Sequence, residues 1–290
     1  MGRRSVETVI QSRSRTVVIG PERPFCIIGE RINPTGRKAF QALLQAGDLS
    51  QLETDVPEQV AGGADMLDVN VGDPLADEVA LMGQAVRLAQ SLTDIPLCLD
   101  SSVIEALEAG LAAYEGKALV NSVTGEDERL EAILPLVAKH GAAVIGLAND
   151  EDIPMEPEVR LAVAKKIVSA AGDYGIPPED IVIDALAMPV GALPNAVTLF
   201  VETLALIREH LGVNTTCGAS NTAFGLPRRS TLGGAFLSIA QSHGLTSAIM
   251  DARSPECVDA VRAGDLLLGR DEWGARWIAS FRQKQAAAAS

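Results

Sequence analysis

Residues 118–147 read ALVNSVTGEDERLEAILPLVAKHGAAVIGL, and this stretch contains one complete strand–helix–strand unit. Ala118–Val120 and Ala143–Leu147 are short and almost wholly apolar, as expected for strands that are buried on both faces. Between them, the apolar residues of Asp127–His140 recur at spacings of three and four, which is typical of an amphipathic helix. The pattern predicts two parallel strands joined by a helix.

The same alternation continues along the chain until it contains eight strand–helix units. The other strand candidates are Cys26–Gly29, Met66–Val69, Leu97–Leu99, Ile181–Ile183, Thr215–Cys217 and Ser247–Met250. Helix candidates between them include Leu49–Gly62, Glu78–Leu92, Pro157–Tyr174, Ala196–Leu211 and Leu232–His243. Eight consecutive units favour a closed barrel over an open sheet. We therefore predict an α/β protein with one domain, a (β/α)8 TIM barrel over residues 25–270, preceded by an N-terminal extension (1–24) and followed by a C-terminal helix and tail (271–290).

Composition excludes several classes of function. The net charge of −14 argues against broad nucleic-acid binding, because that needs basic surface to displace the counterions of phosphates. No apolar run approaches the roughly 20 residues of a membrane span, and no apolar signal segment follows the first residues, so we expect a cytoplasmic protein that does not span a membrane. The four cysteines are far apart, which indicates buried free thiols, and the three histidines are not spaced as ligand pairs, so we expect no metal site.

Polar residues cluster directly after the predicted strands. They are Glu30, Arg31, Asn33, Asp68, Asn70, Asp100, Ser101, Ser102, Asn121, Ser122, Asn149, Asp184, Ser220, Asn221, Asp251 and Arg253. In a (β/α)8 barrel, catalytic groups come from the carboxyl ends of the strands, where the loops vary on a rigid base. We therefore expect the functional site at this rim.

A polar residue after a strand can also be the N-cap of the next helix, and Ser101, Ser102 and Thr124 fit that structural role. Asp100, Asn121 and Asp184 favour function, because each ends an apolar strand, where its side chain points across the barrel mouth. Carboxylates accept two hydrogen bonds, and primary amides both donate and accept them. These groups suit the edge of a flat heterocycle rich in N–H and C=O groups, such as a pterin.

The rim residues give little support to other classes of reaction. It has no convincing Ser/His or Cys/His pair, no GxGxxG segment or P-loop, and no set of zinc ligands. This argues against hydrolysis, hydride transfer on a dinucleotide-binding unit and phosphoryl transfer. Binding and positioning of a ligand are the expected contributions of the rim.

Six segments together resemble the pterin-binding methyltransferase family. They are Ile27–Gly36 (IIGERINPTG), Leu67–Gly72 (LDVNVG), Leu97–Ser101 (LCLDS), Asn121-Ser122, Ile183-Asp184 and Gly218–Asn221 (GASN), in the order in which the family has them. The family includes methyltetrahydrofolate:corrinoid protein methyltransferases and the folate domain of cobalamin-dependent methionine synthase, and it is related to dihydropteroate synthase. The resemblance covers about residues 25–270.

The resemblance implies roles for individual residues. Asp100, Asn121 and Asp184 match the pterin-recognition set, with Gly218 and Ser220 near the ring. Asn221 matches the asparagine that contacts the methyl-bearing nitrogen, which makes it the expected catalytic residue; a structural alternative makes it the N-cap of the next helix. Candidates for a supporting layer are Asp68, Asn70, Glu30 and Asn33. Arg228 and Arg229 either contact the folate tail or only decorate a loop.

The function implied by the resemblance is methyl transfer between 5-methyltetrahydrofolate or tetrahydrofolate and the cobalt of a corrinoid, in one-carbon metabolism or a corrinoid-dependent demethylation pathway. The chain has no DxHxxG cobalamin motif, so the cobalamin must come on a separate corrinoid protein. The resemblance also implies a homodimer.

Two alternatives remain: a non-catalytic folate-binding subunit of a methyltransferase complex, and an enzyme similar to dihydropteroate synthase. The second is disfavoured, because Asn221 replaces the synthase's basic residue and Asp251-Ala252-Arg253 replaces its Arg-His pair. A further departure from many relatives is Gly233-Gly234, where they have an asparagine in the helix after the seventh strand.

Overall fold

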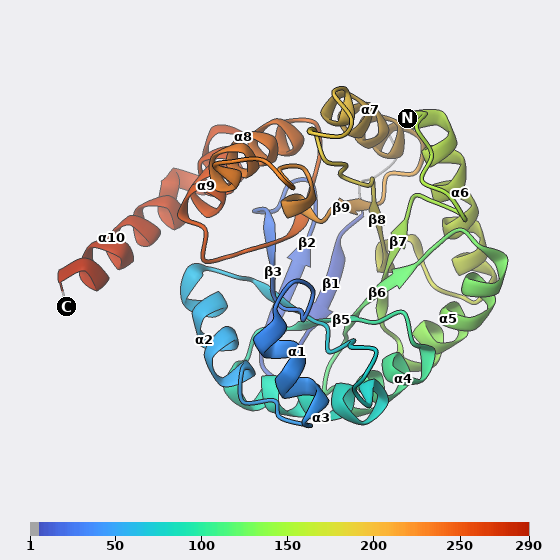
Figure 1. Cartoon of the computed structure of the whole chain (residues 1–290). Coiled ribbons are helices and arrows are strands. Elements are labelled where there is room, and N and C mark those ends of the chain that lie inside the picture. The colour runs from blue at the N-terminus through green and yellow to red at the C-terminus, as the bar shows by residue number, and fades with distance from the viewer. Residues whose placement is uncertain (1–5, 290) are drawn as a thin grey trace.

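The computed structural model describes residues 6–289, and eight parallel strands in this range form a nearly closed barrel surrounded by helices (Figure 1). The barrel strands are β3 (Cys26–Ile32), β4 (Met66–Val69), β5 (Leu97–Asp100), β6 (Leu119–Val123), β7 (Ala143–Leu147), β8 (Ile181–Asp184), β9 (Asn214–Thr216) and β10 (Ser247–Met250). Hydrogen bonding runs in the order β10, β3, β4 and onward to β9. A single parallel bridge between Gly218 and Ile249 joins the two ends of the sheet. The predicted (β/α)8 barrel is confirmed.

Helices cover the outside of the barrel. They are α1 (Lys38–Gln45), α2 (Leu52–Gly62), α3 (Glu78–Leu92), α4 (Ile104–Ala113), α5 (Asp127–His140), α6 (Pro157–Asp173), α7 (Ala196–His210), α8 (Arg229–Ser242), α9 (Pro255–Leu267) and α10 (Ala275–Ala289). Short 3-10 turns are η1 (Pro178–Asp180), η2 (Ala219–Asn221) and η3 (Glu272–Gly274). Within residues 6–289, no helix has the length and apolar character needed to cross a membrane.

Some predicted boundaries are wrong in ways that matter for the site. The seventh barrel strand is β9 (Asn214–Thr216), one residue earlier than predicted. Asn121 does not end its strand, because β6 continues to Val123 through a register shift against β7. The N-cap interpretation of Ser101, Ser102 and Thr124 is also wrong, since Val103 and Glu126 are the N-cap residues of α4 and α5.

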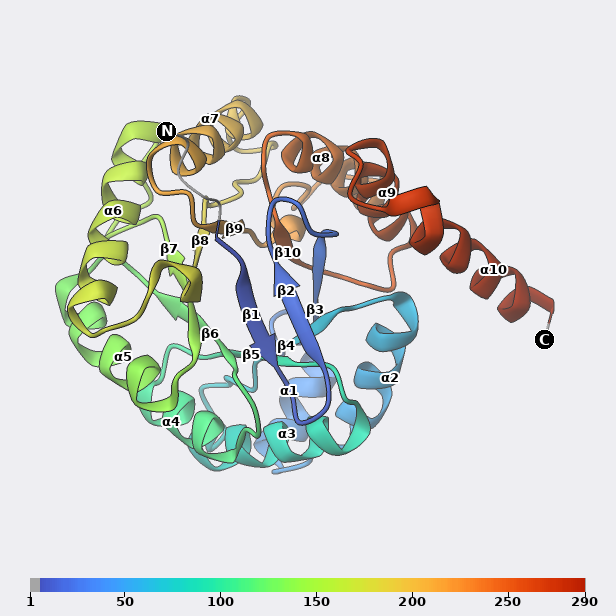
Figure 2. The same ribbon diagram turned by 180° about the vertical axis from the view of Figure 1, so that it is seen from behind.

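The amino-terminal end of the barrel is closed by a hairpin that lies within the predicted N-terminal extension. Strands β1 (Thr8–Gln11) and β2 (Thr16–Ile19) pair antiparallel and lie across this end (Figure 2). Ile10 and Ile19 are fully buried and join the core inside the barrel. Asn214 of β9 fixes the hairpin by donating from Nδ2 to the Thr8 hydroxyl (2.9 Å) and to the Ile19 carbonyl (2.9 Å). Because this hairpin fills the amino-terminal end, a ligand can enter from the carboxyl end of the barrel.

Packing between α8 and α9 explains the Gly233-Gly234 pair. A Cβ atom on Gly234 would lie 2.8 Å from the Glu256 carbonyl oxygen, and one on Gly233 would lie 3.0 Å from Cys257 Sγ. Since both distances are shorter than ordinary van der Waals contact, an asparagine cannot stand here without moving α9. Cys257 and the other three cysteines are free and buried, as predicted.

Candidate active site

Side chains from β4, β5 and β6 meet at the carboxyl end of the barrel in two hydrogen-bonded pairs. Asn121 Nδ2 donates to Asp68 Oδ1 (3.1 Å), and Asn70 Nδ2 donates to Asp100 Oδ2 (2.9 Å). Asp68 is only 2 % exposed, whereas Asp100, Asn121 and Asn70 are half-buried. Asp100 and Asn121 can therefore touch a ligand in the mouth, while Asp68 lies beneath them.

Burial controls the charge of the two carboxyls in this group. It raises the pKa of Asp68 well above its ordinary range, and the neighbouring Asp100 carboxylate adds to the rise. Burial also raises the pKa of Asp100, but the hydrogen bond from Asn70 opposes that rise. The pair therefore favours a proton on Asp68 and the negative charge on Asp100, which faces the mouth.

Asp184 is the last residue of β8 and is 8 % exposed. Burial raises its pKa to about 6, against the hydrogen bond from the Leu186 amide to Oδ1 (2.7 Å) and the charge of Arg160. The Arg160 side chain is fully buried, and its Nη1 donates to the carbonyls of Ala185 (2.7 Å) and Leu186 (2.9 Å). Arg160 therefore holds the loop that positions Asp184.

Arg160 was absent from the sequence-predicted site, although a signal for it exists. It lies on α6 with Ala164 and Ile167, at the spacing of the buried face of that helix. An arginine on such a face must find buried hydrogen-bond acceptors, because an unpaired buried charge is strongly unfavourable. Its acceptors, in the loops after β7 and β8, could not be named from the sequence.

The chain turns sharply after β9 and brings Gly218, Ser220 and Asn221 to the rim. The Asn221 side chain is exposed and its amide lies against Gly218, where an added Cβ atom would be 3.0 Å from Asn221 Nδ2. Asn221 belongs to η2, and the N-cap residue of α8 is Arg228. The alternative in which Asn221 caps the following helix is therefore wrong.

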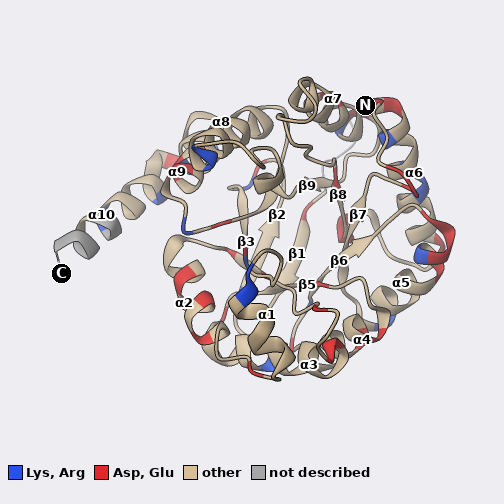
Figure 3. Ribbon diagram, viewed as in Figure 1, with Lys and Arg blue, Asp and Glu red and all other residues tan. Residues whose placement is uncertain are grey.

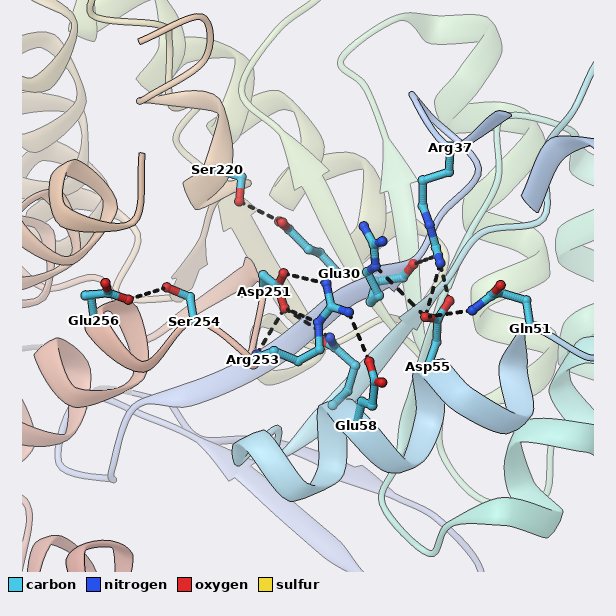
Figure 4. Close-up of polar contacts among 12 residues, drawn as sticks. Glu30, Arg37, Gln51, Asp55, Glu58, Ser220, Asp251, Arg253, Ser254 and Glu256 are labelled. Carbon is cyan, nitrogen blue, oxygen red and sulfur yellow. Dashed lines mark hydrogen bonds and ion pairs between the residues drawn. The ribbon is translucent and has the colours of Figure 1, made fainter. Parts of the chain in front are cut away.

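Glu30, near the end of β3, reaches the same part of the rim. Ser220 Oγ donates to Glu30 Oε1 at 2.7 Å, and the two side chains point toward one another in Figure 4. Arg229 Nη2 donates to the Ser220 carbonyl (3.0 Å), and its guanidinium lies over the exposed ring of Phe224. Arg228 is exposed. A cavity of about 300 Å³ opens beside these residues, lined by the ends of β3 and β10, by η2 and by the first turns of α8 and α9.

Two further rim residues, Asn33 and Arg253, are held by contacts with their neighbours in the structure. Asn33 Oδ1 accepts from the Thr35 amide (2.9 Å), so it orders its own turn. Arg253 forms ion pairs with Asp251 (2.9 Å) and with Glu58 of α2 (3.0 Å), as Figure 4 shows. These contacts hold Asn33 and Arg253 in the wall of the mouth.

A family model described as pterin binding enzyme matches residues 29–251, from β3 to just after β10. The chain belongs to the pterin-binding enzyme family. The resemblance drawn from the six sequence segments is thereby confirmed. Asp100, Asn121 and Asp184 all lie at the mouth of the barrel in this member of the family.

Two relatives of this pterin-binding enzyme differ greatly in length. Methionine synthase of Mycobacterium tuberculosis is 34% identical over 266 residues, covering 86% of this chain and 22% of that protein. The chain thus spans about a fifth of the length of the methionine synthases that it matches. Methylcorrinoid:tetrahydrofolate methyltransferase of Eubacterium limosum is 30% identical over 264 residues, covering 89% of this chain and 96% of that protein.

Solved structures of dihydropteroate synthases share the fold of this enzyme. The Xanthomonas albilineans enzyme with 4-aminobenzoic acid has a TM-score of 0.67 at 19% identity, over 90% of this chain and 98% of that one. The Yersinia pestis enzyme with a pterin–sulfa conjugate has a TM-score of 0.69 at 16% identity, over 90% and 99%. At such low identity the likeness concerns the fold alone.

Proposed function

We propose that this enzyme transfers a methyl group between 5-methyltetrahydrofolate and the cobalt of a corrinoid carried by a separate protein. One observation carries the proposal: the mouth of a pterin-family barrel presents Asp100, Asn121 and Asp184 together with an exposed asparagine, Asn221. The relative from Eubacterium limosum, which matches over nearly its whole length, is named for methyl transfer between a methylcorrinoid and tetrahydrofolate. That name supports the same chemistry here.

The proposed pterin contacts follow from the chemistry of each side chain. Asp100 and Asp184 accept hydrogen bonds from pterin N–H groups, and Asn121 both donates and accepts. Asp68 and Asn70 keep Asn121 and Asp100 oriented through the hydrogen bonds described above. Gly218 and Ser220 lie beside the ring, in the turn that carries Asn221.

Asn221 acts on the nitrogen that carries the methyl group. That nitrogen is a poor leaving group unless it gains a hydrogen bond or a proton as its bond to carbon breaks. Cobalt(I) of the corrinoid is a strong nucleophile, so assistance at nitrogen is the main task left to the protein. An amide aimed at the developing charge contributes about 100 to 1,000-fold in rate.

Two further functions make different predictions. A non-catalytic folate-binding subunit would bind methyltetrahydrofolate without turnover. A synthase would consume a pterin diphosphate and an arylamine, but Arg253 is already paired with Asp251 and Glu58. The carboxylate of Asp251 at this end of the barrel also disfavours a diphosphate.

The test uses purified protein with 5-methyltetrahydrofolate and free cob(I)alamin. Formation of methylcobalamin above the rate without protein is expected, as is the reverse reaction with methylcobalamin and tetrahydrofolate. Binding of methyltetrahydrofolate without either reaction would instead establish the binding subunit. Condensation of a pterin diphosphate with 4-aminobenzoate would establish the synthase.

Arg229 is the proposed contact for the folate tail. Its guanidinium is fixed at the mouth by the Ser220 carbonyl, whereas Arg228 has no such anchor among the described contacts. Arg229→Ala should weaken binding of methyltetrahydrofolate by about 5 to 20-fold while leaving a methylated tetrahydropterin without a tail unaffected. Arg228→Ala is the matched control. Equal losses for both ligands would show that Arg229 acts on the ring or on the fold.

A second copy of this chain is the proposed partner of the surface formed by the end of α9, η3 and α10. The large apolar side chains exposed there are Leu267 (84%), Trp273 (89%), Trp277 (37%), Ile278 (44%) and Phe281 (58%). They include both tryptophans of the chain. Figure 1 shows α10 projecting away from the barrel. The first turns of α10 are held to the barrel, because Arg276 pairs with Asp65 (3.3 Å) and Arg262 donates to Ser280, so the partner is proposed to cover the exposed apolar side chains.

Charge complementarity favours a second copy as that partner. Helix α10 contains basic residues and no acidic ones, whereas the whole chain has a net charge of −14 and acidic segments on α2 and around α5 and α6 (Figure 3). Light scattering after size exclusion should give a dimer for the wild type and a monomer for Trp277→Glu/Phe281→Glu. Tyr174→Glu, an exposed change on the opposite side at the end of α6, is the control. A monomeric wild type would contradict the proposal.

A further inference from the structure

The proposed reaction requires a proton as well as a hydrogen bond. When the methyl group leaves for cobalt, the pterin nitrogen keeps the electron pair of the carbon–nitrogen bond and must be protonated. Asn221 can donate a hydrogen bond, but a neutral amide does not give up a proton at ordinary pH. Some other group near Asn221 must therefore hold that proton.

The three aspartates of the mouth are poorly placed for this task. Asp68 lies beneath Asn121 and is almost fully buried, so exchange with solvent is hindered. Asp100 accepts from Asn70, and Asp184 accepts from the Leu186 amide; among the described contacts, neither carboxyl is hydrogen-bonded to Ser220 or Asn221. Each of the three carboxyls therefore accepts its hydrogen bond from a residue other than Ser220 or Asn221.

Glu30 differs from them in its contacts. Its Oε1 accepts from the hydroxyl of Ser220, the residue directly before Asn221, at 2.7 Å (Figure 4). It lines the cavity of about 300 Å³ at the rim, so its carboxyl is half-buried and still open to exchange with water. A hydroxyl can accept a proton on one side and donate one on the other. Ser220 can thus connect Glu30 to the position beside Asn221.

Charged groups from several elements face Glu30. They are Arg31 on its own strand, Arg229 on α8 and Asp251 after β10, with the Ser220 hydroxyl of η2 and the Cys257 thiol of α9 in the same cavity wall. Burial raises the pKa of Glu30, and the Asp251 carboxylate adds to this, against the Ser220 hydrogen bond and the two arginines. A protonated form of Glu30 is thereby favoured at a higher pH than for a free glutamate.

We propose that Glu30 stores the proton for the pterin nitrogen and delivers it through the hydroxyl of Ser220. This inference rests on the methyl transfer proposed above. The electron pair of cobalt(I) forms the cobalt–carbon bond, and the carbon–nitrogen pair moves onto nitrogen. Nitrogen takes the Ser220 proton while Ser220 takes the Glu30 proton. Glu30 is left as a carboxylate and is protonated again by water through the cavity; methylation of tetrahydrofolate runs the same transfer backward.

The test follows the pH dependence of single-turnover methyl transfer from saturating 5-methyltetrahydrofolate to free cob(I)alamin. In the wild type the rate should fall as pH rises through the pKa of Glu30, because only its protonated form supplies the proton. Glu30→Gln should lower the rate at pH 6 by at least about tenfold and remove this limb of the profile, with folate affinity within about threefold. Glu53→Gln, an exposed change on α2, is the matched control.

Two Ser220 variants test the relay even if Glu30→Gln fails to fold. Ser220→Ala removes the hydroxyl and should slow transfer by about tenfold or more, whereas Ser220→Thr keeps a hydroxyl and should restore most of the rate. A wild-type pH profile in Glu30→Gln, or in Ser220→Ala, would overturn the role of Glu30 while leaving the methyl transfer intact. Absence of transfer by the wild type at every pH would refute the proposed function itself.

Discussion

Replacing Asp184 by asparagine should make the folate-free protein more stable while it weakens folate binding. Asp184 is 8 % exposed, and burial raises its pKa to about 6 from an ordinary 3.8. Because the pKa is higher in the folded state, this carboxyl contributes stability when protonated, and that contribution is lost as pH rises through about 6. Above that pH the protein contains a buried charge that the variant lacks.

The size of the effect follows from the pKa difference. Relative to a carboxyl that stays protonated, a rise of about 2 units lowers the free energy of unfolding by roughly 3 kcal/mol at pH 8 and by about half of that at pH 5. An asparagine oxygen can still accept from the Leu186 amide (2.7 Å), but the asparagine NH2 cannot accept from the Gly218 amide as the carboxylate does, which reduces the gain. We expect Asp184→Asn to raise the free energy of unfolding at pH 8 by about 1 to 3 kcal/mol, and by less at pH 5.

Urea unfolding of both proteins at pH 5 and pH 8 without folate measures this difference, and calorimetry with 5-methyltetrahydrofolate measures the loss of affinity. That loss should be at least about tenfold, as is ordinary for a hydrogen bond to a charged group. Asp173→Asn, an exposed change at the end of α6, is the control. The reasoning is refuted if the gain in stability is equal at both pH values or if folate affinity is unchanged.

Three further changes test other parts of the site. Asn221→Ala should keep folate affinity within about tenfold and the melting temperature unchanged, while single-turnover transfer to cob(I)alamin falls by about 100 to 1,000-fold. A lower melting temperature with normal transfer would remove its catalytic role. Gly218→Ala should reproduce that loss of transfer, because the new Cβ atom would lie 3.0 Å from Asn221 Nδ2 and would displace that amide. Normal transfer by this variant would contradict the prediction. Arg160→Met should lower the free energy of unfolding by about 3 to 5 kcal/mol and weaken folate binding, since the carbonyls of Ala185 and Leu186 lose their buried donor. Chemical unfolding measures the first effect and calorimetry the second.

Local sequence patterns predicted the barrel and much of its rim. Apolar strand runs alternate with helical periodicity in eight units, and these patterns depend on neighbouring residues alone. Asp100 and Asp184 could be assigned to the mouth because each follows directly on such a run, and parallel strands of a barrel present their carboxyl ends at one face. The family resemblance added the catalytic role of Asn221, which no local pattern distinguishes from a helix cap.

The contacts that give these residues their chemistry were decided by tertiary structure. Glu30 and Ser220 are 190 positions apart and meet only because the last strands close the ring beside β3. Arg160 reaches the loop after β8 from α6, and Asn121 finds Asp68 two strands away. Sequence periodicity records which face of an element is buried, but it does not record which distant side chain lies opposite. The raised pKa values of Glu30 and Asp184 depend on that burial and those partners, so they exist only in the closed barrel.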